Sequence, residues 1–248
     1  WLRDRSLRRA DRVVAISQGM ARRRARIGVD PARIEVIENW ADDASIVPIE
    51  PAHNAMRRRW NLEDCFVVGY SGNLGRAHDW RTMADVVGRL QARSDIRFVF
   101  IGGGHGMRQL EASLASRGVC NALFQAYQPR DRLAQGLSLP DLHWVSLEPR
   151  LEGCIFPSKL YGIFAAGRPV LFIGDPGGEL AMRVTRVGAG AALPPMATDA
   201  VADFILDLAD RPERAQAMGR RARSHLEAVA TREQALRSWR DLLAMRSP

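Results

Sequence analysis

Lys159 is the only lysine among the 36 lysine and arginine residues of this chain. Arginine presents a planar fork of donors, whereas lysine presents a compact point charge, so a lone lysine marks a site where arginine would not serve. Lys159 follows Pro157 and Ser158 at the expected start of a helix, where backbone amides and the helix dipole favour an anion. This position predicts contact with a phosphate group. Chance survival of one lysine in an arginine-rich sequence is the alternative, and the rest of the chain has to decide.

A glycine-rich turn over Ser71–Arg76 follows an apolar stretch, Phe66–Tyr70, that we expect to be a strand. Ligands of open α/β sheets bind beyond the carboxyl ends of the strands. Gly72 and Gly75 would let the backbone approach a ligand closely, and Arg76 would supply a cation. The spacing differs from the G-x-G-x-x-G dinucleotide fingerprint, so an ordinary strand–helix turn remains the alternative.

A carboxylate segment precedes Lys159. Glu152 lies in it, and carboxylates beside a phosphate site can accept hydrogen bonds from sugar hydroxyls. Glu152 would then contact a hexose while Ser158 and Lys159 hold its diphosphate, although a solvated loop of mixed charge is the simpler interpretation. Two further glycine segments, 102–106 and 174–179, also follow expected strands. We expect their first glycines to lie near the ligand and the later ones to serve the turn.

Apolar segments of strand length alternate with amphipathic segments along the chain. Near-continuous apolar strands separated by helices are typical of a parallel sheet with both faces covered. We therefore predict an α/β fold with a doubly wound, Rossmann-like parallel sheet. Helices are expected over 79–92, 106–117 and 130–137, and strands over 12–16, 34–37, 66–70, 97–101, 122–125, 142–146, 169–173 and 189–193.

The composition excludes several other classes of protein. Hydrophobic residues make up 46% and charged residues 26%, which supports a packed core rather than disorder. The three cysteines have no CxxC spacing, as expected of a reduced, cytoplasmic protein without a thiolate zinc site. The net charge of +8 suggests nucleic acid or anionic lipid as partners. Since the basic runs lack a nucleic-acid-binding motif, we expect no specific nucleic-acid partner.

A domain boundary is expected between Asn39 and Pro51, where polar residues and prolines interrupt the pattern. The residues before it are too few to bury a sheet by themselves. We interpret residues 1–45 as the tail of a domain whose larger part is absent, residues 46–51 as a linker, and residues 52–248 as a complete doubly wound domain.

Three segments in combination resemble the donor half of family-4 retaining glycosyltransferases, which have the two-domain GT-B fold. The segments are Ser71–Arg76, Ile101–Gly104, and Pro157–Lys159 with Gly167–Val170. The likeness is greatest to the bacterial subgroup that builds O-antigen and other exopolysaccharides. Residues 9–17 and 34–40 are similar to the end of that family's acceptor domain. The resemblance implies that residues 1–45 belong to the N-terminal acceptor domain and residues 52–248 form the C-terminal, nucleotide-sugar binding domain.

The resemblance also implies roles for the candidate residues. Arg76 and Lys159 would neutralise the pyrophosphate of a UDP- or GDP-sugar during transfer, and Glu152 would contact the sugar. The loop Tyr127–Arg130 would border the base. The residues expected to bind the donor beside this catalytic group are Gly72, Asn73, Gly75, Gly102, Gly103, Gln128, Ser158 and Glu179.

Gly162 departs from the family's pattern, because it stands where the family usually has a glutamate that holds the ribose hydroxyls. Glu152 also lies further from this position than the family's spacing has it. The group that holds the ribose is therefore open, and Glu179 is the substitute that we expect.

We therefore expect the donor-binding part of a metal-independent, cofactor-free glycosyltransferase, which passes a sugar to a lipid-linked or saccharide acceptor in surface polysaccharide biosynthesis. The fragment should bind donor but transfer little, in the cytoplasm at the inner face of the membrane. A GT-B-fold nucleotide-sugar epimerase and a non-catalytic nucleotide-binding module are the alternatives. We expect Lys159 to be partly solvated, so that its replacement leaves the stability of the fold nearly constant.

Overall fold

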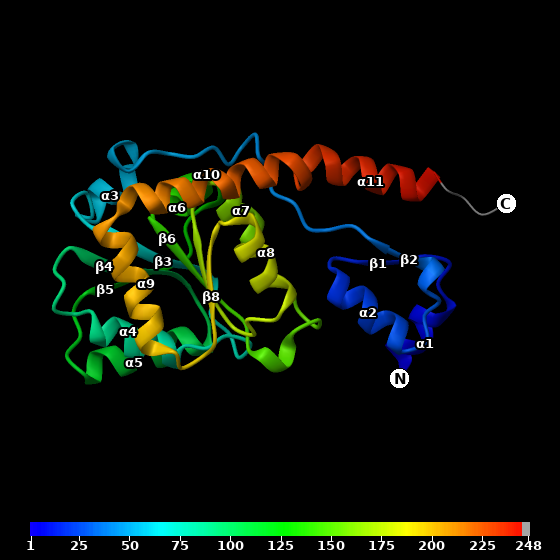
Figure 1. The fold of residues 1–248 in the computed structure, drawn as a ribbon, viewed down its shortest axis with the longest axis horizontal. Helices are drawn as coiled ribbons and strands as arrows, with labels where there is room; N and C mark the ends of the chain where they lie inside the picture. The colour runs from blue at the N-terminus through cyan, green and yellow to red at the C-terminus, as the bar shows by residue number, and fades with distance from the viewer. Residues whose placement is uncertain (245–248) are drawn as a thin grey trace.

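The computed structural model describes residues 1–244, which form a large α/β domain with a smaller N-terminal unit beside it (Figure 1). Two short parallel strands joined through a helix make up most of the small unit, with Val13 opposite Ile34. The elements of this unit are α1 (Leu2–Arg9), β1 (Val13–Ala15), α2 (Gln18–Arg26), η1 (Pro31–Arg33) and β2 (Ile34–Val36).

A six-stranded parallel sheet of order β5-β4-β3-β6-β7-β8 forms the centre of the large domain. The chain starts in the middle of the sheet, winds to one edge, and returns to wind to the other. This is the doubly wound order, so the predicted fold class is confirmed. The strands are β3 (Phe66–Asn73), β4 (Ile96–Gly103), β5 (Ala122–Gln125), β6 (Leu142–Ser146), β7 (Val170–Ile173) and β8 (Gly190–Leu193).

Helices cover both faces of this sheet, and the strand side chains alternate between them (Figure 1). Val68 and Tyr70 belong to the core under α4, α5 and α9, whereas Val67 belongs to the core on the other face. The helices on the first face are α4 (Arg81–Arg89), α5 (His105–Ser116) and α9 (Thr198–Asp210). Those on the second are α3 (Ala55–Arg59), α6 (Leu133–Ser138), α7 (Lys159–Ala165) and α8 (Glu179–Val187).

The two C-terminal helices run along the top of the domain in Figure 1, and the second extends toward the small unit. The first, α10 (Pro212–Val229), contributes Met218 to one core and Leu226 to the other. The second, α11 (Arg232–Ala244), begins beside a backbone bridge between Ala41 and Thr231. The junction between α10 and α11 therefore contacts the segment that leaves the small unit.

Strands β3 and β4 continue past their expected ends, to Asn73 and Gly103. Their last residues pair, with Gly72 opposite Gly102. Gly102 has φ +133°, and a Cβ there would lie 2.2 Å from the carbonyl oxygen of Gly72. Close strand pairing thus requires this glycine, and it fixes the sheet edge at which β3 ends.

The connecting segment after the small unit packs on the large domain. Ala41 and Ile46 are buried in its second core. Arg223 donates to the carbonyl oxygen of Ile46 at 2.8 Å, and Arg168 donates to that of Ile49 at 2.6 Å. Residues 41–51, expected to be the last part of a tail and a linker, are therefore held by hydrogen bonds along the large domain.

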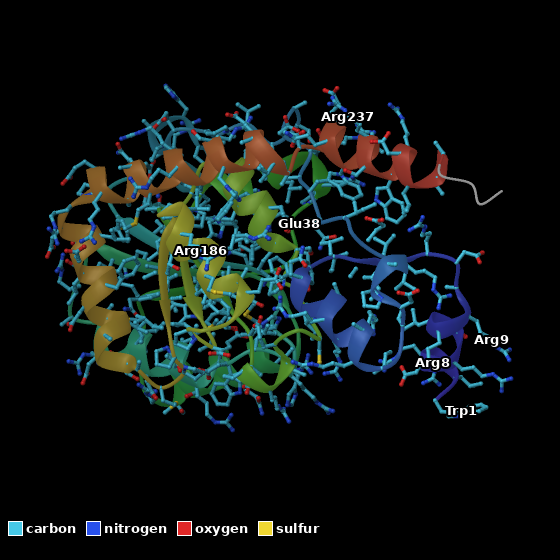
Figure 2. All side chains as sticks on the ribbon, turned by 45° about the vertical axis from the view of Figure 1, so that its right-hand side comes forward. Trp1, Arg8, Arg9, Glu38, Arg186 and Arg237 are labelled. Carbon is cyan, nitrogen blue, oxygen red and sulfur yellow. The ribbon has the colours of Figure 1, made fainter. Side chains whose placement is uncertain are left out.

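An ion pair between Glu38 and Arg183 joins the small unit to α8. The Arg183 guanidinium binds both carboxylate oxygens of Glu38, and the Tyr161 hydroxyl donates to the same carboxylate at 3.2 Å. Burial opposes ionisation of Glu38, but the hydrogen bonds from Arg183 outweigh it and hold the pKa of Glu38 below its usual value. Glu38, labelled in Figure 2, lies where the small unit meets the large domain.

Replacement of Arg57 should test the polar core under α3. Arg57 is 2% exposed, and it donates to the Leu139 carbonyl at 2.8 Å and to the Asp141 carboxylate at 2.5 Å. Arg57→Ala should lower the free energy of unfolding by about 3–5 kcal/mol, because it leaves Asp141 uncompensated. Urea denaturation measures this change. The exposed Arg59 of the same helix is the matched control, and Arg59→Ala should change stability by less than about 0.5 kcal/mol. Equal stability of the two variants would contradict the prediction.

Candidate functional site

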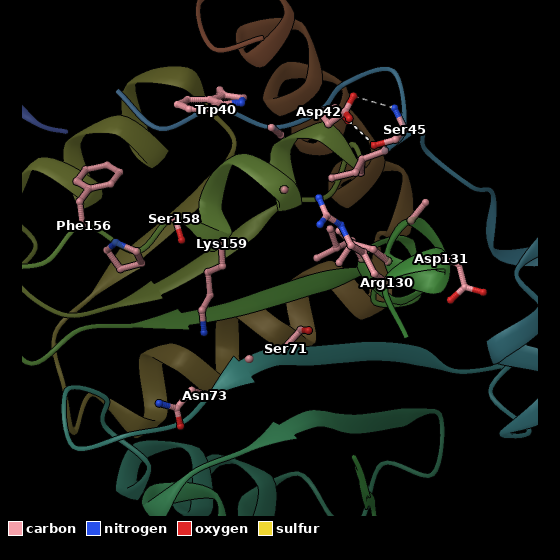
Figure 3. Close-up of a pocket in the computed structure, with 18 of the residues that line it drawn as sticks. Trp40, Asp42, Ser45, Ser71, Asn73, Arg130, Asp131, Phe156, Ser158 and Lys159 are labelled. Carbon is pink, nitrogen blue, oxygen red and sulfur yellow. Dashed lines mark hydrogen bonds between the residues drawn. The ribbon is translucent and has the colours of Figure 1, made fainter. Parts of the chain in front are cut away.

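A cavity of about 1160 Å³ opens where β3 ends, between α6, α7 and the connecting segment (Figure 3). Its size matches pockets that enclose small organic ligands. Apolar walls come from Trp40, Ile46, Leu133, Leu137 and Phe156. The polar side chains that line it are Asp42, Ser45, Ser71, Asn73, His78, Arg130, Asp131, Ser158 and Lys159.

The Lys159 side chain crosses from the start of α7 to the end of β3 (Figure 3). Its Nζ is buried and has no hydrogen-bond partner among residues 1–244. The ammonium lies 3.8 Å from the centroid of the Tyr70 ring, and 3.3 Å from the position that a Cβ on Gly72 would occupy. An aromatic face is thus the contact that stabilises this charge in the ligand-free protein.

Burial lowers the pKa of Lys159 to about 7, because a cation loses its hydration inside the protein without gaining a counter-charge. The expectation that this lysine is partly solvated is wrong, since Nζ is buried. An anion bound in the cavity would supply the missing partner and restore the ordinary protonated state. The site is therefore electrostatically arranged for an anion.

Tyr70 supports this corner of the cavity from beneath. Its hydroxyl donates to the carbonyl oxygen of Asn73 at 3.0 Å, which ties the ring to the end of its own strand. Burial raises the pKa of Tyr70, so the ring stays neutral under the ammonium. The edge of the ring also faces His78, with 6.1 Å between centroids.

His78 lies in the cavity wall, although a histidine after a glycine turn is commonly a local capping residue. Its Nδ1 is 2.6 Å from the carbonyl oxygen of Ser146 at the end of β6. Burial, followed by the positive charge of Lys159, lowers the pKa of His78, so the ring is neutral at pH 7. The imidazole therefore joins the β3–α4 loop to the neighbouring strand.

Four of the predicted residues meet in this cavity, namely Gly72, Asn73, Ser158 and Lys159. Gly72 has φ +126°, which a side chain rarely tolerates, and this conformation leaves the space that the Lys159 ammonium points into. Ser158 is exposed at the start of α7. The structure thus brings Gly72, near the end of β3, next to the solitary lysine.

Glu152 and Glu179 lie outside the cavity lining, and each carboxylate binds the N-terminus of a helix. Glu152 Oε1 accepts from the amide of Glu179 at 2.9 Å, the first residue of α8. Glu179 in turn accepts from the amides of Gln18 at 3.0 Å and Gly19 at 2.6 Å, at the start of α2. Burial raises the pKa of Glu152, and the nearby carboxylates add to this effect. Neither of these two predicted residues is therefore among those that line the cavity with Lys159.

The remaining predicted residues lie around the edge of the sheet. Arg76 is exposed, and within residues 1–244 no hydrogen bond or ion pair reaches its side chain. Gly75 faces the side chain of Asn73, and Gly103 lies beside the Tyr127 ring. Gln128 donates to the Ala126 carbonyl at 2.9 Å. These residues shape the loops but do not line the cavity.

Sequence reasoning missed the residues that the connecting segment brings to the cavity. Trp40, Asp42 and Ser45 line it, although this segment was interpreted as a tail. Its polar, proline-marked sequence indicates a loop, but nothing in it indicates the surface on which the loop packs. Gly162 also lines the cavity, and a Cβ there would lie 3.1 Å from Leu137.

The part of the chain that the structure describes holds no group of three or more His, Cys, Asp or Glu residues placed to bind a metal ion. In the same residues, 1–244, no helix has the length and apolarity needed to cross a bilayer.

Lys159→Met should stabilise the ligand-free protein at acidic and neutral pH, because it removes a desolvated charge. The folded-state pKa of Lys159 lies below its unfolded value of 10.5, so the unfolded chain binds more protons between the two. The penalty is therefore complete below pH 7 and disappears as the pH rises toward 10.5. Denaturation in an anion-poor buffer at pH 6, 8 and 10 (about 2 pH units apart) samples this range.

The stability gained by Lys159→Met should be largest at the lowest of these pH values and shrink with rising pH. The exposed Arg76 provides the control, and Arg76→Met should show no such trend. A Lys159→Met protein that is less stable than the parent at the lowest pH would contradict the prediction.

Parts of the chain are similar in sequence to glycosyltransferases. Residues 1–40 match the family described as glycosyl transferase 4-like domain. The probable glycosyltransferase WbjE of Pseudomonas aeruginosa is 26% identical over 203 residues, covering 81% of this chain and 50% of that protein. The chain thus spans about half the length of this curated relative.

Solved structures share the fold at low sequence identity. The Anabaena Alr3699/HepE structure with UDP and glucose matches with a TM-score of 0.82 and 16% identity, covering 97% of this chain and 65% of that one. WaaG, a glycosyltransferase involved in lipopolysaccharide biosynthesis, matches with a TM-score of 0.68 and 16% identity, covering 85% and 56%. The chain therefore has the fold of GT-B glycosyltransferases, and its sequence and structure are both similar to glycosyltransferases over part of their length.

Proposed function

We propose that the chain is the donor-binding part of a retaining glycosyltransferase, which moves a sugar from a nucleotide-sugar to a lipid-linked or saccharide acceptor in surface polysaccharide biosynthesis. The observation that carries this proposal is the buried Lys159 ammonium, which has no hydrogen-bond partner within residues 1–244, in a cavity of about 1160 Å³ at the carboxyl end of β3. The complex of Alr3699/HepE with UDP, a protein of the same fold, supports a nucleotide-sugar as the ligand.

The diphosphate of the donor would bind at Lys159. The diphosphate oxygens would bind the Lys159 ammonium in place of the Tyr70 ring or together with it. The backbone at Gly72 leaves room for these oxygens. When the bond to the sugar breaks, negative charge develops on the leaving diphosphate. A fixed cation in a water-poor site stabilises that charge strongly, which is the task that a metal ion performs in other enzymes. Arg76, exposed on the same loop, would add a second cation at the rim.

The sugar and the ribose would be held by different carboxylates. Glu152 Oε1 accepts a hydrogen bond from the first amide of α8. No hydrogen bond within residues 1–244 reaches Glu152 Oε2, and this oxygen would accept one from a sugar hydroxyl. Glu179 would have to release two backbone amides to bind the ribose. Asp42 and Asp131 are the carboxylates that line the cavity itself, and we propose these for the ribose hydroxyls. This replaces the earlier assignment of Glu179.

Acceptor binding and membrane contact would be properties of the whole protein. We propose that this chain by itself binds donor and transfers little, because the acceptor domain would supply the remaining catalytic groups. The net charge of +8 would favour the anionic inner face of the cell membrane, where a lipid-linked acceptor would reside.

Calorimetric titration with UDP, GDP and ADP tests the proposal and identifies the base. Lys159→Ala should weaken binding of the preferred nucleoside diphosphate by about 1.5–3 kcal/mol, the range for hydrogen bonds to charged groups. Lys159→Arg should recover only part of this loss, because the planar fork repositions the phosphates. Binding of the uncharged nucleoside should hardly change.

Arg59→Ala, which alters an exposed cation on α3, controls for net charge and should bind as the parent does. The absence of binding to all three nucleoside diphosphates at millimolar concentration would refute the proposal. Equal binding by Lys159→Arg and the parent would refute the specific role of the lysine.

A further inference from the structure

His78 lines the cavity beside Lys159, and within residues 1–244 no hydrogen bond reaches one of its two ring nitrogens. Its other nitrogen, Nδ1, is 2.6 Å from the carbonyl oxygen of Ser146. A carbonyl oxygen can only accept, so Nδ1 carries the hydrogen and donates it. In a neutral imidazole the remaining nitrogen, Nε2, then holds a lone pair and can only accept.

The Nδ1 hydrogen bond fixes this tautomer, and the surroundings of the ring keep it neutral. The Nδ1 hydrogen bond ties the ring to the end of β6, and the ring forms a T-shaped pair with Tyr70 of β3. Burial of the half-exposed ring is the main reason that the pKa of His78 is lowered. The positive charge of Lys159 on α7 adds to this effect, because it disfavours a second cation beside it.

The backbone of His78 is also fixed. Its amide donates to the Gly75 carbonyl at 3.2 Å, and the carbonyl of the preceding Ala77 accepts from the amide of Glu148 at 2.9 Å. Asp79, the next residue, caps α4 by accepting from the Arg81 amide at 2.9 Å. The imidazole is therefore held before any ligand binds, as a specificity residue requires.

Two neighbouring groups of the cavity thus have opposite hydrogen-bonding character. Lys159 offers only donors, which suit phosphate oxygens. A phosphate ester without its protons cannot donate to Nε2, whereas a hydroxyl can. A ligand that satisfies both residues carries a phosphate and, close to it, a hydroxyl group. A nucleoside diphosphate joined to a sugar has this arrangement at the transferred sugar.

We infer that His78 is a specificity residue, which accepts through Nε2 a hydrogen bond from a hydroxyl of the transferred sugar. This inference rests on the proposed nucleotide-sugar function. It distinguishes the sugar nucleotide from the nucleoside diphosphate alone, because only the former carries the hydroxyls of the transferred sugar.

His78→Asn separates the two nitrogens of the ring. The asparagine amide lies near the position of Nδ1 and can still donate to Ser146, but it provides no acceptor at the position of Nε2. Titration calorimetry would compare UDP with UDP-glucose and UDP-N-acetylglucosamine, and GDP with GDP-mannose. The nucleoside diphosphate should bind the variant as it binds the parent, whereas at least one sugar nucleotide of the same base should bind about three- to tenfold more weakly.

His78→Gln supplies an amide that reaches the position of Nε2, and it should recover part of the lost affinity for the sugar nucleotide. His53→Asn, at an exposed histidine of η2 (Pro51–His53), is the matched control and should bind every ligand as the parent does. Thermal denaturation of the variants without ligand confirms that each is folded.

Equal weakening of the nucleoside diphosphate and its sugar nucleotides in His78→Asn would overturn the inference, because the histidine would then serve the fold or the phosphates. Unchanged binding of all ligands would overturn it too. In both cases binding of the nucleoside diphosphate by the parent still supports the proposed function. Failure of the parent to bind any nucleoside diphosphate would instead overturn the proposed function, and this inference with it.

Discussion

The desolvated ammonium of Lys159 is the constraint around which the site is built. A buried charge is costly, and the ring of Tyr70 at 3.8 Å compensates this cost in part. Tyr70 is held by its strand, and the turn at Gly72 leaves the ammonium room. Burial of the ammonium is thus electrostatically unfavourable, and binding of a diphosphate would offset this cost. A cation that is poorly solvated before binding gains more from its ligand than one on the open surface.

A chain of capped helices links the large domain to the small unit. Glu152 caps α8, and Glu179, the first residue of α8, caps α2. Unpaired amides at a helix start attract carboxylates, so both contacts use the same physical chemistry. The Glu38–Arg183 ion pair adds a contact between the small unit and α8. Helix α8 therefore contacts both the loop that precedes Lys159 and the small unit.

His78 and Lys159 would bind different groups of the ligand. Lys159 donates and His78 accepts, and both lie beside Tyr70 at the meeting point of β3, β6 and α7. Parallel strands bring their carboxyl ends to one edge of a sheet, so loops far apart in the sequence meet there. This placement brings Gly72, His78 and Lys159 into one site.

The sequence by itself determined the fold class and the position of every strand, because strands buried on both faces read as short apolar runs between helical patterns. It also assigned Gly72 and Lys159, with Gly75 and Arg76, to one diphosphate site. Only the tertiary structure decided which partner each polar group has. Glu152 and Glu179 are drawn to helix starts, and the segment around Trp40 packs on the cavity. The partner of each of these side chains, a backbone amide or an apolar surface, depends on which groups lie within contact distance. Those distances are set only when the chain folds.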